Sequence, residues 1–144
     1  PDFTFCPLIF AIDLSANGLS GSIPDFNLPA LKTLSVKTNK LNGAVPNLAV
    51  AANLASLQLE NNSFIFGDLV GKRWLCTDVA CNVSASYAPQ AKIPIALSSD
   101  GILSVSTGAP DTDQTFKWFK DGILVATTQS SKLKAQSSGL YNCR

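Results

Sequence analysis

The sequence predicts a mainly β protein in two parts, a short repeat solenoid with a parallel sheet followed by an antiparallel β-sandwich. Asn17, Asn39 and Asn62 recur at intervals of 22 and 23 residues, each after an alternating apolar pattern. From about residue 88 the pattern changes to short alternating runs separated by turn residues. The 144 residues are 46% hydrophobic and 15% charged, which indicates a folded chain with a core.

The first half contains three copies of one pattern. IFAIDLSANGLSGSIP runs from Ile9 to Pro24, LKTLSVKTNKLNGAVP from Leu31 to Pro46, and the shorter LASLQLENNSF from Leu54 to Phe64. In each copy two apolar residues point inward along a short strand: Ile12 and Leu14, Leu34 and Val36, and Leu57 and Leu59. Each copy should therefore contribute one strand to a parallel sheet.

An asparagine follows each of these strands, where the chain must turn. Its side-chain amide can satisfy backbone groups that the bend leaves unpaired. We therefore expect Asn17, Asn39 and Asn62 to form a buried ladder with a structural role.

All three copies resemble the leucine-rich repeat consensus LxxLxLxxNxL, and the first two extend it with GxIP or GxVP, as in the plant-like and bacterial surface versions. The resemblance implies a convex return at Gly21 with Pro24 and at Gly43 with Pro46, and a concave face on which ligands commonly dock. The candidate ligand-binding positions on that face are Asp13, Ser15, Thr33, Ser35, Lys37, Ser56, Gln58 and Glu60, with Ala11 beside them. Because they include no Trp, Tyr or Arg anchor, a simply solvated face is the favoured alternative. Lys37 and Glu60 are expected to pair across adjacent strands.

The chain divides into repeats over residues 1–74, a cap and linker over 75–87, and the sandwich over 88–144. Trp74 is expected to cover the core of the last repeat, since an open apolar end needs a cap. Cys76 and Cys81 enclose four residues and are expected to form a local disulfide, two separate thiols being the alternative. Asn82 and Asn61 are candidate glycosylation acceptors if the protein is secreted by a eukaryote.

Six alternating runs follow in the second half: KIPIAL, ILSVST, TFKWFKDG, ILVATT, SKLKA and SGLYNC. Asp121-Gly122 predicts a tight hairpin. FKWFKDG, followed 25 residues after its Trp by Tyr-Asn-Cys, resembles the core tryptophan and the Gly-x-Tyr-x-Cys signature of immunoglobulin-like domains. The resemblance assigns structural roles to Trp118 and Tyr141.

The chain departs from that family in three ways. The strand that normally carries the first disulfide cysteine offers Ser104 or Val105, so Cys143 lacks its usual partner. Ser137 stands where an acidic residue is common. The chain also ends directly after the Tyr-x-Cys strand, so a sandwich lacking its last strand, with an open edge suited to self-association, is expected.

The opening residues PDFTFCPLIF allow two interpretations. FTFCPLIF could complete the sandwich of a neighbouring molecule, placing Cys6 near Cys143. The favoured interpretation is the tail of a preceding repeat, because PDF recurs at Pro24-Asp25-Phe26. On that alignment Cys6 corresponds to Leu28 and is expected to be a buried thiol.

Composition narrows the function. The chain has no His, which excludes Ser-His-Asp and Cys-His sites. A net charge of +1 without basic runs argues against a nucleic-acid partner. No segment is long and apolar enough to span a membrane, no signal peptide is recognisable, and the cysteine spacing matches no metal site. No cofactor is expected.

These observations favour a non-enzymatic extracellular or cell-surface module for protein or glycan interaction, which could also build a surface assembly or fibre. The alternative is a receptor ectodomain fragment that binds a specific ligand on the concave face. A remote alternative is an appendage of a surface hydrolase. Its candidate acid pairs, Asp111 with Asp113 and Asp2 with Asp13, lie in a predicted turn or in different repeats.

Overall fold

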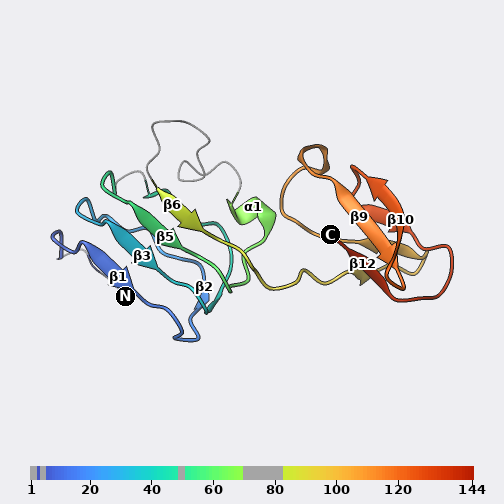
Figure 1. Ribbon diagram of the computed structural model, residues 1–144, viewed down its shortest axis with the longest axis horizontal. Helices are drawn as coiled ribbons and strands as arrows, with labels where there is room; N and C mark the ends of the chain where they lie inside the picture. The colour runs from blue at the N-terminus through green and yellow to red at the C-terminus, as the bar shows by residue number, and fades with distance from the viewer. Residues whose placement is uncertain (1–2, 4–5, 49–50, 70–82) are drawn as a thin grey trace. The chain divides into compact units, whose positions relative to one another are not determined.

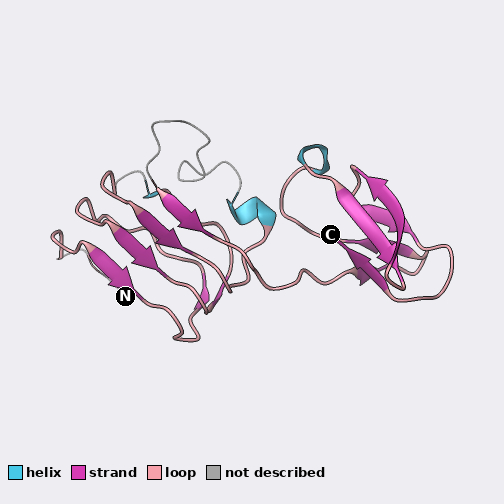
Figure 2. Cartoon of the chain, in the orientation of Figure 1, coloured by secondary structure: helices cyan, strands magenta, loops and turns pink. Residues whose placement is uncertain are grey.

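The computed structural model describes residue 3 and residues 6–48, 51–69 and 83–144. The chain is mainly β and splits into two compact units, Pro1–Ala91 and Lys92–Arg144. Figure 1 labels their elements, and Figure 2 shows that strands predominate. The predictions about Asp2, Trp74, Cys76, Cys81 and Asn82 fall outside the described residues and stay predictions.

The first unit is built on a four-stranded parallel sheet in the order β1-β3-β5-β6. Its strands are β1 (Ala11–Asp13), β3 (Thr33–Ser35), β5 (Ser56–Gln58) and β6 (Ser84–Ser86). Two further short strands, β2 (Ser20–Gly21) and β4 (Lys40–Leu41), pair in parallel, and one turn of helix, α1 (Phe66–Leu69), follows β5. The predicted parallel sheet is confirmed. Figure 1 shows β1, β3, β5 and β6 side by side in that order.

The register of the sheet follows the repeat of the sequence. Ile12 lies opposite Leu34, and Leu34 lies opposite Leu57. The side chains of Leu34, Val36, Leu57 and Leu59 are at most 2% exposed and belong to one core cluster. The alternation of apolar and polar residues therefore decides which face of each strand is buried.

The sheet contains one strand more than the three repeats predict. β6 pairs with β5 so that Ala85 lies opposite Leu57. From Ile12 the inward residues follow one another after 22, 23 and then 28 residues. Because Ala85 replaces the usual leucine and the spacing is longer, the repeat pattern predicts no strand at residues 84–86, which lie in the predicted cap and linker.

The chain leaves three of these strands through the same left-handed turn. Ala16, Thr38 and Asn61 directly precede the repeated asparagines and have φ values of 57°, 58° and 57°. Such angles are uncommon outside glycine, so the surrounding structure must hold them.

Asparagine side chains close these turns. Asn39 Nδ2 donates to the carbonyl groups of Leu14 and Val36, and its Oδ1 accepts from the N–H groups of Asn17 and Leu19. Asn62 makes the equivalent bonds one repeat later, to Val36 O, Leu59 O and Leu41 N–H. Both side chains are buried, as the ladder requires.

Asn17 does not follow the prediction of a buried ladder. It is exposed, and its Nδ2 donates only to Ser15 O. The reason is its position after β1, the outer strand of the sheet, where no described strand lies beyond it.

Cys6 is also exposed, so the prediction of a buried thiol is wrong. The repeat register that led to it nevertheless appears in the backbone. The hydrogen bond from Ile9 N–H to Cys6 O recurs from Leu31 N–H to Leu28 O and from Leu54 N–H to Ala51 O. The backbone from Cys6 to Ile9 thus makes the same local turn as the two later segments, although the Cys6 side chain is exposed.

The second unit contains two three-stranded antiparallel sheets, in the orders β10-β9-β12 and β11-β8-β7. Their strands are β7 (Ala96–Leu97), β8 (Ile102–Ser104), β9 (Phe116–Lys120), β10 (Ile123–Thr128), β11 (Lys132–Lys134) and β12 (Tyr141–Cys143). A 3₁₀ turn at Asp111–Asp113 precedes β9. Each of the six predicted runs contains one strand.

One core cluster draws on both sheets of this unit. Trp118 is fully buried and lies with Leu103 and Phe116, while Tyr141 and Cys143 pack against them. The hairpin at Asp121-Gly122 is confirmed, since both residues have positive φ and join β9 to β10. Cys143 is a free thiol, and burial raises its pKa.

Candidate binding face of the parallel sheet

The outward side chains of the parallel sheet form rows that cross its strands. The register places Ala11, Thr33, Ser56 and Ser84 in one row, and Asp13, Ser35, Gln58 and Ser86 in the next. Ser15, Lys37 and Glu60 continue past the strand ends, where Ala16 N–H donates to Lys37 O and Thr38 N–H to Glu60 O. All eight candidate ligand-binding residues therefore lie on this polar face, together with Ser84 and Ser86.

Ser84 and Ser86 were missed because β6 departs from the repeat spacing. The signal available for them was the alternation of Val83 and Ala85 with the two serines. This alternation covers only four residues, and its inward residues, Val83 and Ala85, are small.

Ser35 was expected to face solvent but is only 4% exposed. Its hydroxyl donates to Gln58 Oε1 over 3.0 Å. Because serine is short and its neighbours across the sheet are longer, Gln58 and Asp13 cover it. Ser35 orders the polar face rather than offering itself to a ligand.

The expected ion pair between Lys37 and Glu60 is absent. Among the described residues the one salt bridge joins Lys120 to Asp121. The hydrogen bonds of Ser15 lower the pKa of Asp13 most, and the charge of Lys37 lowers it further. Glu60 Oε2 is enclosed and has no hydrogen-bond partner in the described part of the chain.

The carboxylate of Asp13 is held by its own turn. The Ser15 hydroxyl lowers the pKa of Asp13 most, and the Ser15 N–H, 2.9 Å from Oδ1, acts in the same direction. Both hydrogen bonds favour the charged form. Asp13 is thus a fixed negative charge on the first strand of the face.

Ser15→Ala is expected to raise the pKa of Asp13 towards the ordinary aspartate value, as measured by NMR titration of its carboxyl carbon. The folded-state pKa is depressed, so this contribution to stability is present above the unfolded-state pKa and disappears as pH falls through the folded-state pKa. Ser20→Ala, in β2, should leave the titration unchanged. An unshifted Asp13 in Ser15→Ala would contradict the assignment.

The hydrogen-bond ladder of Asn39 and Asn62 ends at Gln90, a residue that the repeat pattern does not identify. Gln90 Nε2 donates to Leu59 O, and its Oε1 accepts from the N–H groups of Asn62 and Phe64. Asn39 Oδ1 accepts from Asn17 and Leu19 in the same pattern. A longer amide side chain, 28 residues after Asn62, therefore replaces the asparagine of a further repeat.

Two further candidates, the acid Asp111 and the glycosylation candidate Asn61, take part in hydrogen bonds within the fold. Asp111 Oδ2 accepts a hydrogen bond from Ser131 N–H over 2.7 Å, so its carboxylate links the 3₁₀ turn to the residue that precedes β11. Asn61 is exposed, and its N–H donates to Pro89 O. The described residues include no group of three metal-ligating side chains, and no helix in them is long and apolar enough to cross a membrane.

The polar face offers hydroxyl, amide and carboxylate groups at the spacing of parallel strands, about 4.8 Å apart. Such a face can exchange hydrogen bonds with a polar ligand that lies across the strands. Comparison of the chain with protein-family models, with curated proteins and with solved structures finds no match.

Proposed function

We propose that this chain is a non-enzymatic extracellular or cell-surface module that combines leucine-rich repeats with an immunoglobulin-like domain and binds a polar protein or glycan ligand. The concave face of the repeats is the binding site. The observation that carries the proposal is the polar face itself, with its rows of short hydroxyl side chains across four neighbouring strands.

The repeat assignment is supported by recurring local geometry. The inward residues and the left-handed turns recur with the 22- and 23-residue period, and the hydrogen bonds of Asn39 are repeated by Asn62. This is what stacked identical units produce, since each buries its apolar edge against the next.

The immunoglobulin-like assignment is supported by the surroundings of two aromatic residues. Trp118 is buried in a core shared by two sheets. The Tyr141 hydroxyl donates to Ser137 O, four residues upstream, over 3.0 Å. A tyrosine two residues before the cysteine that bonds back to upstream backbone is a hallmark of such sandwiches.

The composition of the polar face favours a ligand rich in hydroxyl groups. Thr33, Ser56, Ser84 and Ser86 each offer a donor and an acceptor, while Asp13 accepts. Protein ligands usually need Trp, Tyr or Arg anchors, which this face lacks. We therefore favour an oligosaccharide over a protein as the ligand of this face.

The test is an array of immobilised oligosaccharides probed with the fluorescently labelled chain. Gln58→Arg places a long side chain over the second row and is expected to weaken binding to any recognised sugar at least about tenfold. Asn42→Arg adds the same charge at an exposed position after β4 and should bind like the wild type. Circular dichroism checks that both variants fold. Absence of binding to every sugar, or equal binding by Gln58→Arg, would contradict the proposal.

A further inference from the structure

The edge strand β1 has backbone groups that no described residue uses. Just before β1, Phe10 O accepts from Thr33 N–H. Just after it, the N–H groups of Leu14 and Ala16 donate to Ser35 O and Lys37 O, so the even-numbered residues of this segment point their backbone groups towards β3. Backbone direction alternates along a strand, and the N–H and C=O groups of Ala11 and Asp13 therefore point away from β3. An open edge of this kind can accept another strand.

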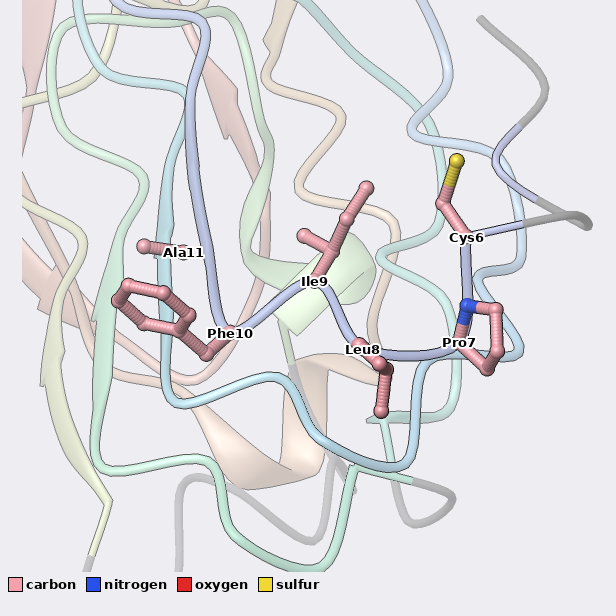
Figure 3. A pocket seen from close by; sticks show the side chains of 6 residues that line it. All are labelled: Cys6, Pro7, Leu8, Ile9, Phe10 and Ala11. Atoms are coloured by element: carbon pink, nitrogen blue, oxygen red, sulfur yellow. The ribbon is translucent and has the colours of Figure 1, made fainter.

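Two large apolar side chains lie directly before this edge. Leu8 is 84% exposed and Phe10 is 65% exposed. With Cys6, Pro7, Ile9 and Ala11 they line an open hollow of about 490 Å³. Figure 3 shows Leu8 projecting from the opposite side of the segment to Cys6 and Ile9.

The repeat does not require apolar residues at either position. Phe10 O accepts from Lys32 and Thr33 N–H, as Lys32 O accepts from Ala55 and Ser56 N–H, so Lys32 is the equivalent of Phe10. In the same register Leu8 corresponds to Ala30 and to Asn53. A stacked repeat would explain apolar character at the Cys6 and Ile9 positions, but not at Leu8 and Phe10. These two side chains point to a different contact.

The charge and geometry of this edge fit a second copy of the same chain. Residues 6–24 carry one formal charge, Asp13, so like copies repel each other little. Antiparallel pairing centred on Ile12 would set Ala11 of each copy opposite Asp13 of the other. Both are residues with outward N–H and C=O groups, as a hydrogen-bonded antiparallel pair requires. In that register Phe10 faces Leu14 of the second copy.

We propose that two copies of this chain associate through their β1 edges in a two-fold symmetric dimer, with Leu8 and Phe10 covering the contact. The interface is isologous and closes on itself. It is independent of the ligand proposed for the polar face. The edge of β10, where Ile123, Leu124 and Val125 are exposed, is the competing surface, but a register shift between Leu124 and Ala126 interrupts it.

Sedimentation equilibrium tests the dimer with substitutions taken from the repeat itself. The wild type should dimerise with a Kd in the micromolar range, which suits a small interface. Phe10→Lys and Leu8→Asn introduce the residues found at the equivalent positions Lys32 and Asn53, so they preserve the fold. Each should raise the Kd at least about tenfold, whereas Val125→Lys should not change it. A monomeric wild type, an unchanged Kd in Phe10→Lys, or loss of the dimer in Val125→Lys would overturn the proposal.

Cross-linking tests the register. In a background that carries Cys6→Ser and Cys143→Ser, Ala11→Cys and Asp13→Cys chains are mixed with oxidised glutathione. A hydrogen-bonded antiparallel pair places Cα atoms about 5.5 Å apart, within disulfide range. The mixture should give a disulfide-linked dimer that neither variant gives alone. No such dimer would refute the register. An upstream segment of the same polypeptide is the other possible occupant, and loss of the dimer when the chain is extended by residues encoded before Pro1 would overturn the proposal.

Discussion

Asn62→Ala should lower the free energy of unfolding of the first unit by about 3 kcal/mol. The substitution removes a side chain that is 2% exposed. It leaves the N–H group of Leu41 without its partner. The carbonyl groups of Val36 and Leu59 each lose one of two hydrogen bonds and keep those from Asn39 and Gln90. The unpaired Leu41 N–H costs about 1 to 3 kcal/mol and each of the two lost carbonyl hydrogen bonds about 0.5 to 1.5 kcal/mol, and entry of water into the space would offset part of the sum. Residue-resolved amide exchange of β3 and β5 measures the loss.

Asn17→Ala is the matched control, because it removes the same side chain at the equivalent position of the first repeat. Asn17 is exposed and its side chain makes one local bond, so the loss should stay below about 0.5 kcal/mol. Amide exchange in β9 should be unchanged in both variants, since it belongs to the second unit. Equal losses for Asn62→Ala and Asn17→Ala would refute the buried ladder.

The regular part of the first unit could be predicted from the sequence because one physical requirement recurs. Every strand must bury two apolar residues, and every turn must provide hydrogen-bond partners for its backbone groups. The same residue pattern therefore occurs three times in the sequence. Strand β6 was not predicted, because Ala85 buries little surface and follows Leu57 at a longer spacing than the repeat has. The role of Gln90 was not predicted, because its side chain reaches Leu59 O and Asn62 N–H from a distant position in the sequence.

The candidate site was predicted as a set of positions but not as a set of interactions. Strand alternation placed the outward residues, since it depends only on the period of the backbone. The burial of Ser35 and the hydrogen bonds of Ser15 that lower the pKa of Asp13 depend on the lengths and rotamers of neighbouring side chains. Such details need the three-dimensional register, which a single sequence does not contain.

In the second unit, Trp118→Ala should cost about 3 to 5 kcal/mol of unfolding free energy. Trp118 is fully buried, and it lies with Leu103 and Phe116 in a small cluster that draws on both sheets. Its removal leaves a large cavity that few neighbours can fill. Amide exchange of β8 and β9 gives the loss without relying on the tryptophan signal that the substitution removes. Phe119→Ala, on the next residue of the same strand and only half-buried, should lose about 1 kcal/mol.

Trp118→Phe separates packing from hydrogen bonding at this site. Trp118 Nε1 is buried and has no partner among the described residues. An unpaired buried donor carries a desolvation cost of about 1 to 3 kcal/mol, which phenylalanine removes. This gain offsets part of the packing lost with the larger ring, so Trp118→Phe should cost no more than about 1 to 2 kcal/mol. A loss as large as that of Trp118→Ala would mean that the indole N–H is hydrogen-bonded in the folded protein.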